Sequence, residues 1–188
     1  MKSQANELQK KYYALTADQY DRQHLLDGDE HYLALNYLDG LIKFYGLKTI
    51  LDIGAGTGRA ALFLLDRNPD LQIISIEPVK ELREIGHSKG LNESNLVEGD
   101  VYKLAFENDS FDLVCAFGVF HHLKYPLKAL DEMKRVSKTA IYISDSNNFG
   151  QGNNLTRKLK QFFNFLKIWN LLVYAKTKGK MYSLSLIH

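Results

Sequence analysis

The stretch TILDIGAGTGRAA, residues 49–61, decides the fold of this chain. A β-branched, apolar run passes through Asp52 into a glycine-rich turn, and a helical pattern begins near Arg59. A strand that leads through such a turn into a helix is typical of a parallel α/β sheet, whose ligands bind at the carboxyl ends of the strands. The stretch therefore predicts a ligand site at this turn, and the glycine spacing bears on which ligand binds.

Strand and helix patterns alternate along most of the chain. Short apolar runs predict five strands, at residues 48–53, 71–77, 95–100, 111–120 and 139–145. Apolar residues at three- and four-residue steps predict the helices, at residues 33–45, 59–67, 79–90 and 126–137. This alternation predicts a doubly wound, Rossmann-like α/β fold with a mostly parallel sheet and helices on both faces.

Charge is unevenly distributed along the chain. Residues 151–188 contain seven Lys or Arg and neither Asp nor Glu, whereas residues 1–150 contain 17 basic and 22 acidic residues. The basic segment is expected to contact something anionic, or the acidic body itself. With a formal net charge of +2, the chain as a whole gives no indication of nucleic-acid binding.

The sequence also bears on location. The N-terminus lacks the apolar segment of a secretory signal, and no run of about 18 apolar residues predicts a transmembrane helix. The single cysteine, Cys115, lies in an apolar run and is expected to be a buried thiol. We therefore expect a cytoplasmic protein.

The glycine turn departs from the two common phosphate-binding patterns. Gly54, Gly56 and Gly58 alternate, and Arg59 stands where a dinucleotide fingerprint needs a third small residue. No Gly-Lys-Ser/Thr follows, so the turn is not a P-loop. A nicotinamide-dependent oxidoreductase is therefore a disfavoured alternative.

Two acidic residues follow the next two predicted strands. The Glu77 carboxylate is placed to accept hydrogen bonds from both hydroxyls of a ribose. The Asp100 carboxylate is placed to accept a hydrogen bond from the exocyclic amine of an adenine. Together they predict an adenosyl ligand.

The chain resembles the class I S-adenosylmethionine-dependent methyltransferases of the small-molecule type in four segments, which occur in the family's order: ILDIGAGTGRAA, IISIEP, VEGDVYKLAFENDSFDLVCAFGVFHHL and ALDEMKRVSKTAIYISD. The resemblance covers roughly residues 45–146 and implies S-adenosyl-L-methionine as the cofactor. This methyl donor carries a sulfonium cation and no phosphate, in agreement with the turn. The residues it implies for cofactor binding are Tyr20, Asp52, Gly54, Ala55, Gly56, Gly58, Glu77, Pro78 or Val79, Asp100, Val101, Ala116 and Phe117.

The resemblance also assigns roles within this set. Asp52 and the glycine turn would lie along the methionine part of the cofactor, and Ala116 or Phe117 near its amino group. Asp100 and the Val101 backbone would contact the adenine. Tyr20, with Tyr12 and Tyr13, is a candidate to cover the methionine end.

The catalytic residues are less defined by the sequence. His121 and His122 follow the fourth predicted strand, and either is a candidate base for a proton that leaves an oxygen or nitrogen acceptor. No third ligand accompanies the two histidines, so we expect no metal site. The pattern Asn-Pro-Pro-Tyr is absent after this strand, which argues against the usual DNA-adenine and protein-glutamine methyltransferases.

We expect a single domain with three parts: an N-terminal helical cap (1–45), a cofactor-binding core (46–146) and a basic amphipathic insertion or lid with one candidate strand (147–188). The basic helix is a lid, an anionic-membrane contact through residues 155–180, or an ordinary packing helix. Only residues 180–188 resemble a further strand, so the C-terminal strands are expected to be incomplete.

The predicted function is methyl transfer to a small-molecule substrate. The alternatives are a catalytically weak or truncated relative that binds the cofactor, and a membrane- or protein-docking module on the same scaffold.

Overall fold

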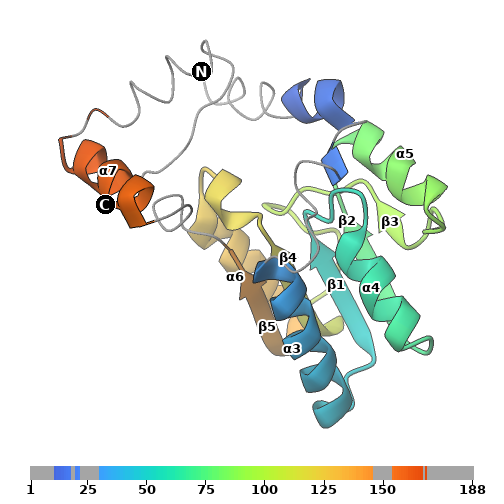
Figure 1. Cartoon of the computed structure of the whole chain (residues 1–188). Coiled ribbons are helices and arrows are strands. Elements are labelled where there is room, and N and C mark those ends of the chain that lie inside the picture. Colours follow the sequence, from blue (N-terminus) through green and yellow to red (C-terminus); the bar gives the residue numbers. More distant parts are fainter. Residues whose placement is uncertain (1–10, 18–19, 22–29, 146–153, 167, 169–188) are drawn as a thin grey trace.

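The computed structural model describes residues 11–17, 20–21, 30–145, 154–166 and 168. Its five strands form one parallel sheet in the order β3-β2-β1-β4-β5 (Figure 1). The strands are β1 (Thr49–Ile53), β2 (Gln72–Ile76), β3 (Leu96–Val97), β4 (Phe111–Phe117) and β5 (Ser137–Ser144). From residue 30 on, the described helices are α3 (Glu30–Tyr45), α4 (Arg59–Arg67), α5 (Lys80–Ser88), α6 (Pro126–Val136) and α7 (Asn154–Phe165), and residues 11–16 of the N-terminal segment are also helical.

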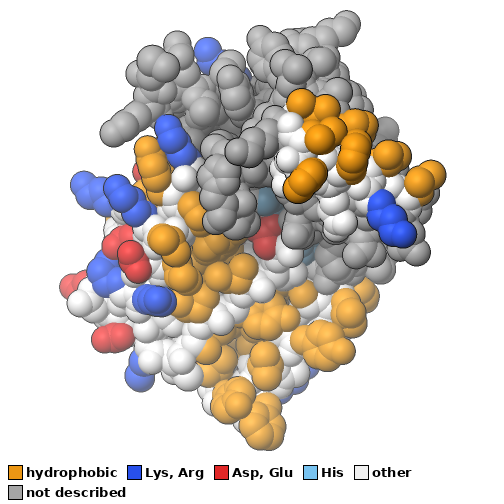
Figure 2. Space-filling view, turned by 90° about the vertical axis from the view of Figure 1, so that its left-hand side faces the viewer, with side chains coloured by type: hydrophobic (Ala, Val, Ile, Leu, Met, Phe, Trp, Pro, Cys, Tyr) orange, Lys and Arg blue, Asp and Glu red, His pale blue; other side chains and the backbone are white. Residues whose placement is uncertain are grey.

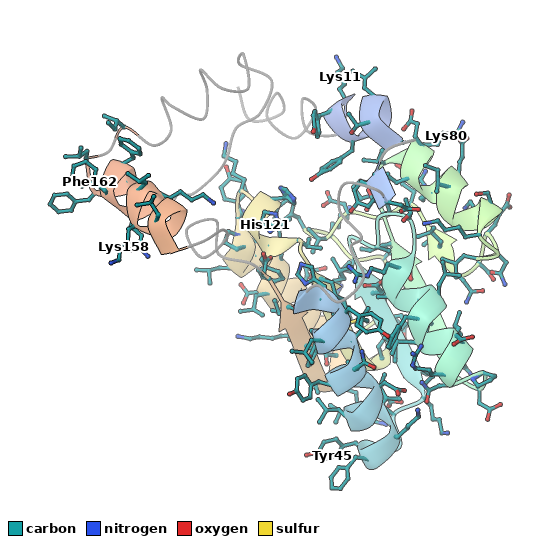
Figure 3. All side chains as sticks on the ribbon, in the orientation of Figure 1. Lys11, Tyr45, Lys80, His121, Lys158 and Phe162 are labelled. Atoms are coloured by element: carbon teal, nitrogen blue, oxygen red, sulfur yellow. The ribbon has the colours of Figure 1, made fainter. Side chains whose placement is uncertain are left out.

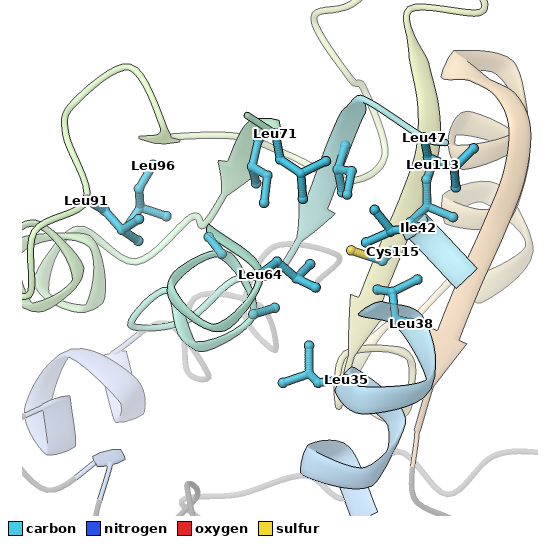
Figure 4. Packing of buried hydrophobic residues seen from close by; sticks show 14 residues of the cluster. Leu35, Leu38, Ile42, Leu47, Leu64, Leu71, Leu91, Leu96, Leu113 and Cys115 are labelled. Carbon is cyan, nitrogen blue, oxygen red and sulfur yellow. The ribbon is translucent and has the colours of Figure 1, made fainter. Parts of the chain in front are cut away.

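Helices cover both faces of the sheet, so the predicted doubly wound α/β fold is confirmed. On one face, Leu38 of α3 and Leu64 of α4 pack with Ile50 of β1 in a fully buried cluster (Figure 4). On the other face, Met133 of α6 packs in a second buried cluster with Val114 of β4. The alternation of side chains along each strand explains why neighbouring residues such as Ile50 and Leu51 belong to different clusters.

The helix ends follow the sequence signals. Gly46 adopts φ +64° directly after α3, and the Leu47 N–H donates to the Ile42 carbonyl at 3.0 Å. Pro126 is the first residue of α6, where its missing N–H costs no helical hydrogen bond.

The structure corrects two predicted strand ends. β4 ends at Phe117 rather than at residue 120, because Gly118 adopts φ +67° and a 3-10 turn, η2 (Phe120–His122), follows. β3 contains only two residues of the predicted 95–100, and the chain then turns where the Asp100 carboxylate accepts the Tyr102 N–H at 2.9 Å. Both corrections place loop residues, rather than strand residues, at the carboxyl edge of the sheet.

The C-terminal part is described only in α7, which confirms the predicted basic helix over residues 154–165. The candidate strand at 180–188 lies outside the described residues. Among the residues that the structure describes, each helix is too short or too polar to cross a lipid bilayer.

Candidate cofactor and active site

A cavity of about 480 Å³ opens at the carboxyl ends of the strands. Gly54 follows β1 at its wall, Glu77 follows β2 and Val119 lies in the loop after β4. Asp100 lines it from the loop after β3, and Tyr20 from the N-terminal segment. The cavity therefore lies where the first strand-turn-helix unit predicts a ligand.

The cavity brings together eight of the predicted site residues: Tyr20, Gly54, Glu77, Pro78, Asp100, Val101, Phe117 and His122, together with Val79. The predicted residues that do not line it are Asp52, Ala55, Gly56, Gly58, Ala116 and His121. Three of these residues have identifiable contacts: Gly56 with Glu77, Asp52 with Ser75 and Cys115, and His121 with Asp145.

Gly56 is joined to the cavity through the Glu77 carboxylate. Glu77 Oε2 accepts the Gly56 N–H at 3.0 Å, and its Oε1 accepts the Val79 N–H at 2.9 Å. The carboxylate is buried and lines the cavity. These two amide hydrogen bonds orient the Glu77 carboxylate at the cavity wall, where a carboxylate suits ligand hydroxyls.

Tyr20 closes over the glycine turn. Gly56 adopts φ +57°, and a side-chain Cβ at this position would come within 2.8 Å of the Tyr20 hydroxyl oxygen. Burial raises the pKa of Tyr20 above its ordinary value, so the phenol remains protonated. Glycine at position 56 therefore allows both the turn and the close approach of the aromatic ring.

Asp52 lies beneath the turn on the face covered by α3 and α4. It is opposite Ser75 of β2 and Cys115 of β4, and both side chains donate to its carboxylate, at 3.5 and 3.8 Å. Burial raises the pKa of Asp52 to about 7. Cys115 is fully buried, as expected from the sequence, and burial raises its pKa as well.

A polar cluster ties the N-terminal segment to the glycine turn. The Thr57 hydroxyl donates to Asp21 Oδ1 at 2.6 Å and accepts a hydrogen bond from Lys89 Nζ at 2.9 Å. Lys89 Nζ also pairs with Asp21 Oδ2 at 2.5 Å. Sequence reasoning missed this cluster, because its three members come from three distant segments. Thr57 lies in the glycine turn, but the sequence gives no signal for its contacts with Asp21 and Lys89.

The two histidines have different surroundings, and Figure 3 labels His121. His121 Nδ1 lies 2.6 Å from Asp145 Oδ1, and the His121 N–H donates to Asp145 Oδ2 at 3.1 Å. Burial alone would raise the pKa of Asp145, but the hydrogen bonds from His121 lower it below its ordinary value. His122 lines the cavity instead, with its Nε2 3.0 Å from the Tyr13 hydroxyl.

Several residues of the cavity wall carry no sequence signal, among them Tyr102, Lys103 and Leu123. Asp145, which pairs with His121, does carry a sequence signal, because it is the last residue of the fifth predicted strand, at the functional edge of the sheet.

The lining residues fit the methyl donor better than a phosphate-bearing ligand. Three carboxylate residues, Glu77, Glu98 and Asp100, line the cavity, and among its described lining residues Lys103 is the one Lys or Arg. This donor set suits hydroxyls, amines and a cation, and it disfavours phosphates. Within the described part of the chain, no group of three or more His, Cys, Asp and Glu residues could hold a metal ion.

Fold and cavity together define a Rossmann-like α/β domain with an adenosyl-type site, and comparison with known proteins gives its family. Residues 51–142 match the family model of a methyltransferase domain. An uncharacterized methyltransferase of Schizosaccharomyces pombe is 33% identical over 104 residues, which cover 50% of this chain and 37% of the relative. A demethylmenaquinone methyltransferase of Deinococcus radiodurans is 33% identical over 93 residues, covering 47% of this chain and 38% of the relative.

Solved structures agree with these matches. The YcgJ protein from Bacillus subtilis has a TM-score of 0.57 and 28% sequence identity, covering 73% of this chain and 58% of that chain. Residues 51–142 therefore form a methyltransferase domain similar to the class I S-adenosylmethionine-dependent methyltransferases, a family that implies S-adenosylmethionine as the cofactor. The match covers little more than a third of the length of each of these two curated relatives.

Proposed function

We propose that this protein transfers the methyl group of S-adenosylmethionine to a small-molecule acceptor. The observation that carries the proposal is the composition of a single cavity. Gly54, Glu77 and Asp100 line it as the groups suited to the cofactor, and His122 and Tyr13 line it as groups suited to a reacting acceptor. When bound, the cofactor supplies an activated methyl group, and the chain supplies its position and that of the acceptor.

The chemistry of the remaining wall favours an acceptor with a planar, apolar body and one nucleophilic oxygen or nitrogen. Tyr13 and Tyr102 contribute aromatic rings, and Val119 and Leu123 contribute aliphatic surface. Aromatic and aliphatic walls with few polar groups are typical of sites for small apolar ligands. The relative named demethylmenaquinone methyltransferase is consistent with an acceptor of this class.

Within this function, His122 is the proposed base. It lines the cavity, whereas His121 does not, and His121 Nδ1 is held by Asp145. His122 would accept the proton that the acceptor oxygen or nitrogen gives up on methylation, while the bound cofactor would supply the methyl group and leave as the demethylated thioether. Tyr13 holds the His122 ring through the 3.0 Å contact, and His121 packs beside it at a centroid distance of 3.8 Å.

Labelled S-adenosylmethionine incubated with a panel of phenols, hydroquinones, alcohols and amines tests the proposal. We expect transfer to a phenolic or hydroquinone member, and a fall of about 100-fold in turnover for His122→Ala. His121→Ala is the matched control, with a smaller loss because it acts through its neighbour. Cofactor binding without transfer to any panel member would contradict the proposed acceptor class. Near-wild-type turnover of His122→Ala would show that His122 is not the base.

A further inference from the structure

Helix α7 presents an apolar stripe to solvent. The stripe consists of Leu155, Leu159, Phe162 and Leu166, at steps of four, three and four residues along one side of the helix. Their exposed fractions are 69, 44, 55 and 45%. Large apolar side chains in a contiguous row are normally buried, so an exposed row has the character of a binding surface.

The described body of the protein does not cover this stripe. In the part of the chain that the structure describes, no α7 residue belongs to the three core clusters or lines the cavity. Figure 1 shows α7 set apart from the sheet, and Phe162 lies on its outer side in Figure 3. Figure 2, seen from that side, shows apolar side chains gathered on this outlying part of the molecule. Packing onto the core therefore does not account for the stripe.

The charge around the stripe has one sign. Lys158 is exposed beside it, and Lys160 lies toward the polar side of the helix with Gln161 and Asn164. Residues 151–188 contain seven Lys or Arg and no acidic residue, while residues 1–150 contain more acidic than basic residues. An anionic surface would attract the α7 region and repel the body, so charge alone would orient the molecule.

We propose that α7 binds the surface of an anionic phospholipid membrane. Its apolar stripe enters the boundary between headgroups and acyl chains, and its lysines contact lipid phosphates and carboxylates. A strongly amphipathic helix with a basic polar face and aromatic residues on the apolar face suits this arrangement. A groove in a partner protein also accepts an apolar helix face, but a one-signed charge extending well beyond the helix favours an extended anionic surface.

Vesicle binding by the full chain tests the proposal, and it is independent of methyl transfer. The probe is a phosphatidylcholine vesicle with about 30% phosphatidylserine, compared with pure phosphatidylcholine. We expect co-sedimentation with the anionic vesicles only, weakened by added salt. The single tryptophan, Trp169, lies soon after α7 in the sequence, and its emission should shift to shorter wavelength on binding.

Two variants and one control make the test specific. Phe162→Asp should lower the vesicle partition coefficient about tenfold, and Lys158→Glu combined with Lys160→Glu should do the same. Phe44→Asp, on the far exposed end of α3 at 79% exposure, should leave it unchanged. Because these side chains lie outside the core, all variants should melt at the wild-type temperature. The proposal is overturned by absent binding at low salt, by equal effects of Phe44→Asp and Phe162→Asp, or by self-association through the stripe without vesicle binding.

Discussion

The two ends of the cavity are built in different ways. At the end that we propose for the cofactor, backbone amides and buried groups fix the wall: Glu77 accepts the Gly56 and Val79 amides, and Thr57 donates to Asp21. At the end that we propose for the acceptor, the wall consists of side chains from distant segments, such as the pair of Tyr13 and His122, 109 residues apart.

We expect this difference to separate the part of the cavity that binds the cofactor from the part that determines which acceptor is methylated. A wall made of backbone tolerates little change, because each substitution disturbs a turn or an amide partner. A wall made of side chains can change composition while the fold stays the same, so the acceptor can differ among proteins with one cofactor.

The glycine turn should be the least tolerant part. Gly58 adopts φ +83°, and a Cβ there would clash with the Cδ1 methyl group of the buried Leu91 side chain. Gly58→Ala combines left-handed strain of about 1–2 kcal/mol with a steric clash of about 1–3 kcal/mol. We expect the free energy of unfolding, measured by urea denaturation, to fall by the sum of these two contributions.

Gly46→Ala is the matched control for that variant. Gly46 also adopts a left-handed φ, of +64°, but a Cβ there would meet nothing within 4 Å. It should therefore lose only the strain of about 1–2 kcal/mol. Equal losses at positions 46 and 58 would show that the turn is not packed as described.

The buried carboxyl under the turn should make stability depend on pH. The pKa of Asp52 is about 7 in the folded protein and near 3.8 when the chain is unfolded. Between these values the folded state holds a proton that the unfolded chain releases, so the free energy of unfolding falls as the pH rises. The slope is about 1.4 kcal/mol per pH unit, or about 2 kcal/mol from about pH 5.5 to pH 7.

Asp52→Asn cannot titrate and should remove this part of the pH dependence. The measurement is urea denaturation of both proteins at several pH values between about 5 and 8. Parallel curves for the variant and the wild type would rule out the raised pKa of Asp52.

Disrupting the polar cluster of Asp21, Thr57 and Lys89 should have a moderate effect on cofactor affinity. Thr57→Val removes the hydroxyl that donates to Asp21 and accepts from Lys89, and should weaken S-adenosylhomocysteine binding by about 1 kcal/mol, or roughly fivefold. Thr57→Ser keeps the hydroxyl and should bind as the wild type does. Calorimetry that finds the same affinity for the Val and Ser variants would exclude a role of this cluster in cofactor binding.

A substitution at the proposed acceptor end should change cofactor affinity least. Tyr13→Phe keeps the ring and removes only the hydroxyl next to His122, so the free energy of unfolding should change by less than about 0.5 kcal/mol. Cofactor affinity should also stay within about twofold, while turnover with an identified acceptor falls. A loss of cofactor affinity without a loss of turnover would reverse the assignment of the two ends.

The same contrast explains what the sequence could predict. The alternation of strands and helices, the covering of both sheet faces and the place of Glu77 follow from local patterns, because period, glycine turns and strand ends are encoded within short stretches. The contacts of Asp145 with His121, and of Lys89 with Asp21, depend on how distant segments meet in the fold. Asp52 combines a feature that the sequence predicts with one that it does not. Its position in the glycine-turn motif can be seen in the sequence, but its burial between Ser75 and Cys115 cannot.

The most direct test of the account is calorimetry of ligand binding to the wild type and to Glu77→Ala. We predict that S-adenosylmethionine and S-adenosylhomocysteine bind the wild type and that NADH does not. Glu77→Ala should weaken binding by about 1–3 kcal/mol, because it removes a charged acceptor and releases the Gly56 and Val79 amides. Binding of NADH alone, or an unchanged dissociation constant in a folded Glu77→Ala variant, would contradict the account.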